Sequence, residues 1–364
     1  MGWKTLGFAL FCFLFAYYIY APIPENIEEC WKIGIMNTFL KITSFMAMFF
    51  ENIDENVTVI DTAFSHIPVR LPAVIFIHGG GFALESCKQF SSDFLSRWTA
   101  NKLDAVVVGV DYRLAPQYKF PVALEDCIVV VKFFIQDKIL EKYEVDPTRI
   151  CITGYSSGGT LATKVLQNDP EFKGKIKAQA LIYPPLQLIE TLMPSHQEYE
   201  HGLILTKETA IKLICLYLTK DEALPQAMLK NQHMTEESRH LLKYVNWSVY
   251  LPEKYKKNHV YTEPIFGKLK GSYPFLVDSR ISPLILSDSE LQKLPLTYIL
   301  TCQHDILRDD GLIYAIQLQN VGILVTHDHI EDGFHGGLSF GVTFSLPIGF
   351  KIKDKYISWL EENL

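Results

Sequence analysis

Apolar, β-branched runs alternate along most of the chain with segments whose apolar residues recur at helical spacing. Six runs predict β-strands, at 73–78, 105–111, 149–153, 179–183, 296–301 and 325–330. Helical spacing predicts helices over 92–102, 121–138, 157–167 and 307–321, and a closing helix that reaches Leu364. Strands that alternate with helices predict an α/β fold, with a mostly parallel sheet covered on both faces.

The alternation stops between about residues 186 and 286. This stretch mixes helical and irregular segments, has several Pro and Tyr residues and contains no clear strand. It therefore predicts a helical cap inserted into the sheet domain. A separate helical pattern over 31–50 predicts either a core helix or a helix that rests on the membrane and roofs the active site. We expect one catalytic domain over 22–364, with cap elements at about 22–55 and 186–286.

The N-terminal segment 1–21 is apolar, and Lys4 is its only charged side chain. Twenty helical residues span about 30 Å, the thickness of the hydrocarbon core of a bilayer. Tyrosines cluster at the downstream end, where aromatic rings favour the membrane interface. We expect a signal-anchor that leaves the catalytic domain in the lumen of the endoplasmic reticulum. The alternatives are a cleaved signal peptide, which implies secretion, and a buried helix of a soluble domain.

Composition narrows the classes of partner and compartment. The chain of 364 residues is 48% hydrophobic and has a formal net charge of -7. Nucleic acid needs a basic surface, so we do not expect it as a partner. Sequons at Asn56 and Asn246 predict glycosylation in the lumen. Of seven cysteines, Cys12 lies in the apolar segment, which leaves six to pair, in spacings unlike a zinc site.

A glycine-rich motif, Gly-Tyr-Ser-Ser-Gly at 154–158, joins a predicted strand to a predicted helix. Such a turn holds a serine hydroxyl out of the backbone, where a base can take its proton. Ser156 is therefore the candidate nucleophile. The alternative, an ordinary glycine-rich turn, becomes less attractive because a second and rarer glycine motif precedes it in the chain.

That second motif is His-Gly-Gly-Gly at 78–81, directly after the strand 73–78. Successive glycines can turn their N–H groups toward a carbonyl oxygen as it becomes negative. We expect an oxyanion hole built from His78, Gly79, Gly80, Gly81 and Ser157, in which the donors are the amides of Gly80, Gly81 and Ser157. A phosphate-binding loop is the alternative, but no Lys-Ser/Thr pair follows the glycines.

The candidate acid and base follow the last two predicted strands. In this architecture the chain order is Ser, then Asp or Glu, then His. Asp305 follows the strand 296–301, and His335 follows the strand 325–330. Two neighbouring pairs compete for these roles. His327 and His329 lie within a predicted strand. Asp309 and Asp310 lie in the first turn of a predicted helix, where the helix dipole favours carboxylates.

Five motifs resemble those of the hormone-sensitive-lipase type of α/β-hydrolase, and within it the arylacetamide deacetylases. They are HGGGF, DYRLAP, GYSSGG, HDILRDDG and DGFHG, and the similarity covers nearly the whole chain. The resemblance implies the α/β-hydrolase fold and hydrolysis of carboxylic esters or amides. Aromatic and aliphatic residues in the predicted cap favour a small-molecule substrate with apolar acyl or aryl groups. The resemblance places the triad on Ser156, Asp305 and His335. This chemistry needs neither a cofactor nor a metal.

The chain departs from the family at several positions. The turn at 154–158 that carries the candidate nucleophile corresponds to the nucleophile elbow of the family, and Tyr155 stands where that elbow usually has Asp. The resemblance implies that relatives have a cysteine at the position of Ala83, which bridges to the cysteine that matches Cys302. This chain has alanine there, so a bridge to Cys302 would need Cys87 instead. The chain is also shorter between Phe50 and Glu51 and around Leu71. We expect the second shortening to remove pairing partners beside the strand 73–78. A catalytically weak relative with a lipid-binding role is therefore the alternative function.

Overall fold

The computed structural model describes residues 70–168, 170–269 and 273–364. The predicted signal-anchor at 1–21, the predicted cap element at 22–55 and the sequon at Asn56 lie outside these ranges. Within them, no helix is both long and apolar enough to cross a membrane.

Six strands form one sheet, in which every pair of neighbours is parallel. The order across the sheet is β2-β1-β3-β4-β5-β6. The strands are β1 (Leu71–Ile77), β2 (Val106–Val110), β3 (Val145–Tyr155), β4 (Ala178–Ile182), β5 (Leu296–His304) and β6 (Val325–Phe334). Each predicted strand is present, and the predicted α/β fold is confirmed.

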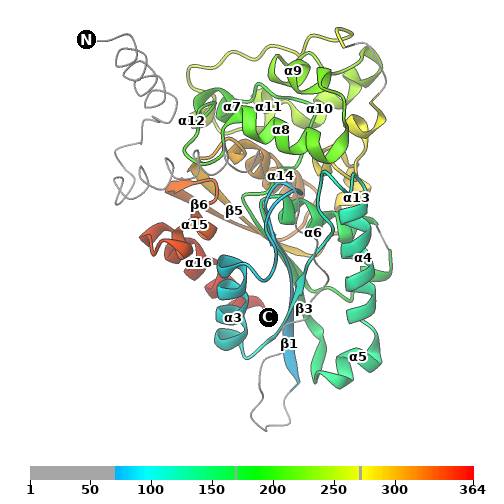
Figure 1. The fold of residues 1–364 in the computed structure, drawn as a ribbon, viewed down its shortest axis with the longest axis vertical. Helices are drawn as coiled ribbons and strands as arrows, with labels where there is room; N and C mark the ends of the chain where they lie inside the picture. Colours follow the sequence, from blue (N-terminus) through cyan, green and yellow to red (C-terminus); the bar gives the residue numbers. More distant parts are fainter. Residues whose placement is uncertain (1–69, 169, 270–272) are drawn as a thin grey trace, which may run out of the picture.

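Helices cover both faces of this sheet (Figure 1). One face packs against α3 (Phe90–Leu103), α15 (Gly337–Thr343) and α16 (Pro347–Asn363). The other packs against α4 (Val122–Phe134), α6 (Ser157–Asn168) and α14 (Arg308–Asn320). Alternate residues of β1 point to the two sides: Val74 and Phe76 enter the first core, and Ile75 and Ile77 enter the second. Burial on both faces explains why the strands are continuously apolar.

Some predicted boundaries were wrong. The segment 121–138 forms α4 and α5 (Asp137–Lys142), separated by a break after Phe134. The predicted closing helix is α16, and Pro347 begins it because its fixed φ suits the first helical turn. Strand β3 starts at Val145, four residues earlier than predicted, because Val145 pairs with Leu71 of β1.

The expected loss of partners beside β1 was also wrong. Residues 73–77 pair with β2 on one edge and with β3 on the other. The amide of Leu71 donates to the carbonyl of Glu144 at 2.7 Å. Pro72, which has no N–H, lies where the register shifts between Leu71 and Ala73. Within the described part of the chain, the edge strands are β2 and β6, and β1 is fully paired.

The predicted cap stretch 186–286 contains short helices and no strand in its described part. Its α-helices are α7 (Pro194–Glu198), α8 (Lys207–Leu218), α9 (Ala223–Leu229), α10 (Leu242–Val245), α11 (Trp247–Tyr250) and α12 (Glu253–Lys256). They lie together at one end of the sheet, at the top of Figure 1, and α13 (Asp288–Leu291) leads back to β5. The division into domains remains a prediction.

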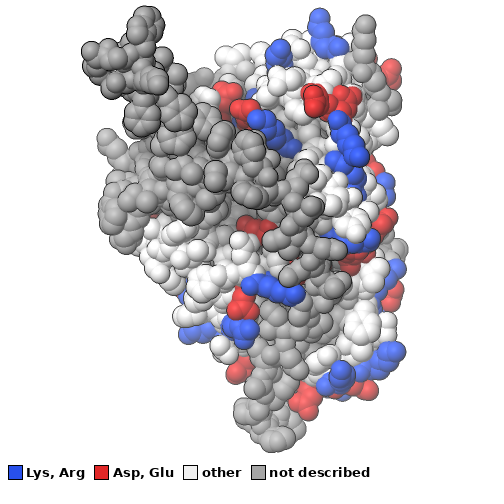
Figure 2. Space-filling view, in the orientation of Figure 1, with Lys and Arg blue, Asp and Glu red and all other residues white. Residues whose placement is uncertain are grey.

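The cysteines of the described residues are free and buried. Cys87 donates through Sγ to the carbonyl of Val110 at 3.2 Å, and Cys302 packs against Gly333. Cys87 therefore does not replace the missing cysteine in a bridge to Cys302. On the face drawn in Figure 2, basic and acidic side chains are interspersed over the described residues.

Candidate active site

A sharp turn between β3 and α6 carries the candidate nucleophile. Ser156 has φ +53°, in the left-handed region that is strained for a residue with a side chain. A Cβ on Gly158 would lie 2.2 Å from the carbonyl oxygen of Ile77, and one on Gly154 would lie 2.3 Å from that of Gly158. The turn can therefore approach β1 only because these positions are glycine. The amide of Ser156 donates to the carbonyl of Ile182 at 2.9 Å, which fixes the turn.

The structure brings Ser156, His335 and Asp305 together from the ends of three strands. Oγ of Ser156 lies 3.0 Å from Nε2 of His335, and Nδ1 of His335 lies 2.9 Å from Oδ2 of Asp305. Asp305 is fully buried, and its Oδ1 accepts the amide of Leu307 at 2.8 Å. The ring of Tyr183 lies 4.8 Å from that of His335. Asp305 thus holds the imidazole with Nε2 directed at the serine hydroxyl.

The glycine loop after β1 faces the same site. Gly80 and Gly81 have φ +93° and +62°, and both line the cavity that contains Ser156. Neither amide has a hydrogen-bond acceptor among the described residues. Ser157 is the first residue of α6, so its N–H has no preceding helical turn to bind. Three backbone donors therefore border the nucleophile.

His78 and Gly79 lie behind this cavity and shape the loop. The buried ring of His78 stacks on Tyr112 at 4.3 Å, and its Nδ1 donates to the carbonyl of Gly79 at 2.9 Å. The hydroxyl of Tyr112 donates to the carbonyls of His78 and Gly79 at 3.1 and 3.0 Å. Burial lowers the pKa of His78 to about 4, so its ring is neutral at pH 7.

A cavity of about 280 Å³ opens beside the nucleophile. Its walls include Ser156, His335 and apolar side chains of the predicted cap, among them Leu205, Ile211, Leu213 and Met228. An apolar pocket with a few convergent polar groups is the usual form of a small-molecule site. Among the described residues, no group of three or more His, Cys, Asp or Glu side chains is placed to hold a metal ion.

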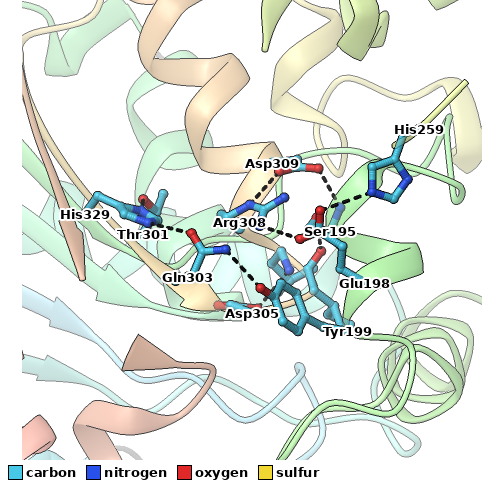
Figure 3. A network of polar contacts seen from close by, with 12 residues as sticks. Ser195, Glu198, Tyr199, His259, Thr301, Gln303, Asp305, Arg308, Asp309 and His329 are labelled. Atoms are coloured by element: carbon cyan, nitrogen blue, oxygen red, sulfur yellow. Dashed lines mark hydrogen bonds and ion pairs between the residues drawn. The ribbon is translucent and has the colours of Figure 1, made fainter. Parts of the chain in front are cut away.

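A buried polar network lies next to Asp305 (Figure 3). Arg308 is fully buried; its Nε donates to Asp309 at 2.9 Å and its Nη1 donates to Glu198 of α7 at 2.8 Å. Asp309 also accepts the amide of Ser195 at 2.7 Å. The network therefore joins α14 to α7 of the predicted cap. The sequence suggested only a helix-dipole role for Asp309, and it gave no sign that Arg308 would be buried.

The two competing histidines take structural positions. Nε2 of His327 and Nδ1 of His329 lie 2.8 and 2.9 Å from Oγ1 of Thr301 on the neighbouring strand. Nε2 of His329 also lies 3.1 Å from Oε1 of Gln303, and Nε2 of Gln303 donates to the hydroxyl of Tyr199 (Figure 3). Neither histidine lines the cavity.

Glu85 is a site residue that sequence reasoning missed. It lines the cavity, and burial raises the pKa of its carboxyl. The hydroxyl of Tyr155 donates to Glu85 and lies 3.0 Å from Oγ of Ser92. Tyr155 therefore supplies polar contacts at the elbow, although its ring replaces the acid usual in the family. An acidic residue in a loop carried no signal that could have identified Glu85.

The chain is similar to known hydrolases. Residues 74–241 and 226–339 match the α/β-hydrolase fold family. The chain is 56% identical to human arylacetamide deacetylase-like 2, with 100% of both chains covered, and 45% identical to bovine arylacetamide deacetylase, with 99% of both covered. The chain belongs to the arylacetamide deacetylase family of α/β-hydrolases. Its general class, carboxylic-ester hydrolase, follows from this membership.

Solved structures agree with this assignment. A thermostable carboxylesterase cloned from a metagenomic library has a TM-score of 0.62 and 25% identity, over 91% of this chain and 97% of that chain.

The alignment with the human relative spans 401 positions, more than the 364 residues of this chain, so the relative has segments that this chain lacks.

Proposed function

We propose that this chain hydrolyses carboxylic esters or amides with apolar acyl or aryl groups, through a triad of Ser156, His335 and Asp305. The observation that carries the proposal is the continuous hydrogen-bonded line from the serine hydroxyl through the imidazole to the buried carboxylate. The relatives named as arylacetamide deacetylases support the same class of substrate.

The geometry supports a two-step acyl transfer. Oγ of Ser156 attacks the substrate carbonyl while Nε2 of His335 takes the hydroxyl proton, and Asp305 stabilises the imidazolium. The amides of Gly80, Gly81 and Ser157 donate to the oxyanion. His335 then gives its proton to the leaving alcohol or amine, which departs and leaves an acyl-serine. Water attacks this ester with His335 as base, releases the acid and restores the serine.

The Ser156→Ala variant tests this proposal. Hydrolysis of p-nitrophenyl acetate should fall by roughly 10⁴-fold or more while the melting temperature stays near that of the wild type. A fluorophosphonate probe should label the wild type and not the variant. His335→Ala should fall to a similar level, since triad members act as a unit. Wild-type turnover in Ser156→Ala would show that the elbow is not the site.

The apolar cavity supports the substrate class. Acyl groups that fill it should gain binding energy, since each buried methylene contributes about 0.8 kcal/mol. In a series of p-nitrophenyl esters, kcat/KM should therefore rise from acetate to medium chains and fall once the chain exceeds the cavity. A series that falls steadily from acetate would contradict an apolar acyl substrate.

We also propose that residues 1–21 anchor the chain in the endoplasmic reticulum membrane, with glycans on Asn56 and Asn246 in the lumen. Support comes from the apolar segment and the two sequons. Asn246 is half-buried, and its Oδ1 accepts the amide of Ser248 at 3.1 Å at the start of α11. Endoglycosidase treatment should increase the mobility of the chain on a gel, and the increase should be smaller for Asn246→Gln. Extraction with alkaline carbonate should leave the chain in the membrane pellet. Release into the medium would favour a cleaved signal peptide.

A further inference from the structure

The hydrogen bond between Glu85 and Tyr155 connects the two glycine motifs. Tyr155 directly precedes Ser156 in the elbow, and Glu85 lies in the loop that begins with Gly80. The tyrosine hydroxyl donates to the glutamate carboxylate and is also within 3.0 Å of Oγ of Ser92 in α3. Both residues line the cavity that holds the nucleophile. A side-chain contact thus joins the segment that supplies the oxyanion donors to the segment that supplies the nucleophile.

The ring of Tyr155 makes a second contact with the same loop. A Cβ on Gly79 would lie 2.6 and 2.7 Å from Cε2 and Cδ2 of this ring. The ring therefore packs directly on the backbone of the residue before Gly80. It also lies 5.9 Å from the ring of Phe76 in β1 and 6.4 Å from that of Tyr183. Tyr155 fixes the start of the glycine loop through its ring, and a later point of the loop through its hydroxyl.

Glu85 is held in an uncommon backbone conformation. Its φ is +71°, in the left-handed region where a residue with a side chain is strained. Such a conformation persists where the surroundings over-determine it. After Glu85, the amide of Cys87 and the hydroxyl of Ser86 donate to Asp111 at 2.9 and 3.1 Å. Asp111 therefore anchors the far end of the loop, and Glu85 anchors the end nearer the nucleophile.

We propose that Glu85 and Tyr155 are a pair of positioning residues that hold the amides of the glycine loop in line with the nucleophile. The proposal rests on the proposed function of Ser156. Backbone donors stabilise an oxyanion only at hydrogen-bond distance from its position in the transition state. A loop that shifts away from the elbow loses this stabilisation while the substrate still enters the cavity. The pair should therefore act on kcat more than on KM.

Four variants test the contributions of the hydroxyl and the carboxylate. Tyr155→Phe keeps the ring and removes the donor, and Glu85→Ala removes the acceptor. Glu85→Gln keeps a carbonyl oxygen that can accept the tyrosine proton. In hydrolysis of p-nitrophenyl acetate, the first two should lose about tenfold in kcat with KM within about twofold, a fraction of the effect of deleting an oxyanion donor. Glu85→Gln should retain most of the wild-type kcat, and Tyr155→Phe/Glu85→Ala should be no worse than either single variant.

Labelling by the fluorophosphonate probe should slow in parallel with kcat, because it depends on the same donors. Tyr356→Phe is the matched control: it removes the hydroxyl of a buried tyrosine in α16 that does not line the cavity, and it should keep the wild-type kcat. Wild-type kcat in both Tyr155→Phe and Glu85→Ala, with Ser156→Ala inactive, would overturn the positioning role alone. A lower melting temperature with unchanged kcat would overturn it too. An active Ser156→Ala would instead overturn the proposed function. If Tyr155→Phe does not fold, the contrast between Glu85→Ala and Glu85→Gln still decides.

Discussion

The two halves of the candidate site are held in place by different means. The half with the nucleophile and the glycine loop depends on close backbone approach, at Gly158 against Ile77 for example. The half with the acid and base depends on buried charged side chains, where Arg308 bridges Asp309 and Glu198. A Cβ on Gly158 would lie 2.2 Å from the carbonyl oxygen of Ile77, so the backbone must move to accept any side chain there. The side chains of the polar network can instead change their conformations.

This difference predicts how each half responds to change. Displacement in the first half moves the reacting atom and the oxyanion donors directly. Loss of a partner in the second half leaves a buried charge unpaired, which destabilises the folded chain more than it displaces Ser156. We call the half with the nucleophile and the glycine loop the glycine half, and the half with the acid, the base and the buried network the polar half. Apart from the triad residues themselves, we expect activity to be most sensitive to changes in the glycine half and stability to be most sensitive to changes in the polar half.

Outside the triad, Gly158→Ala should have the largest effect on activity. Its Cβ would meet the carbonyl oxygens of Ile77 and His78 at 2.2 and 2.4 Å, so the backbone must move. The free energy of unfolding should fall by roughly 1–3 kcal/mol, and kcat by about 100-fold, as expected for a misplacement near 1 Å. Gly174→Ala is the matched control. A Cβ there meets nothing within 4 Å, and its φ of +81° costs only about 1–2 kcal/mol. Equal kcat in the two variants would refute the contrast.

Arg308→Met should have the largest effect on stability. It leaves Asp309 and Glu198 without their cation, and unfolding should become easier by about 3–5 kcal/mol in chemical denaturation. At a temperature where the variant is folded, kcat should fall much less than in Gly158→Ala. Replacing the acids as well, in Arg308→Met/Asp309→Asn/Glu198→Gln, should recover part of the stability because no unpaired charge remains. A triple variant less stable than Arg308→Met would contradict this account of the network.

The same difference explains how much the sequence could predict. The strands and the positions of Ser156, Asp305 and His335 at strand ends followed from local patterns, because glycine turns and apolar runs are continuous in the chain. The structure brings those three residues together, and their catalytic roles form part of our proposal. Arg308 and Glu198 are 110 positions apart and form an ion pair through the fold. Nothing local to either residue indicates that contact.

The pairing of β1 shows the limit of arguing from a shortened segment. The sequence located the short connection near Leu71 and suggested that β1 would suffer. In the structure β1 is paired with both β2 and β3, because its partners come from later in the chain. Strand order in a parallel sheet depends on crossovers, so the neighbour of a strand cannot be identified from the adjoining sequence alone.

Asp310→Asn should have an effect on stability that depends on pH. Asp310 is buried in the polar half: it lines the cavity and accepts the amide of Leu186 at 2.8 Å and the side-chain amide of Gln187 at 3.1 Å. Burial raises its pKa to about 7, whereas an unfolded aspartate titrates near 3.9. The folded state therefore binds the proton more tightly, and this carboxyl favours folding below about pH 4. That contribution is lost as pH rises through about 7.

An asparagine does not titrate, so the variant lacks this dependence. Relative to the wild type, Asp310→Asn should be least stable near pH 4 and should gain steadily up to about pH 8, in melting temperatures measured across that range. Asp137→Asn, at the exposed start of α5, controls for the loss of one carboxylate from the chain. A stability difference between Asp310→Asn and wild type that stays constant, or that grows more unfavourable as pH rises, would show that Asp310 is held as a carboxylate by its two donors. The polar half would then be stabilised by charge at this position as well as at Arg308.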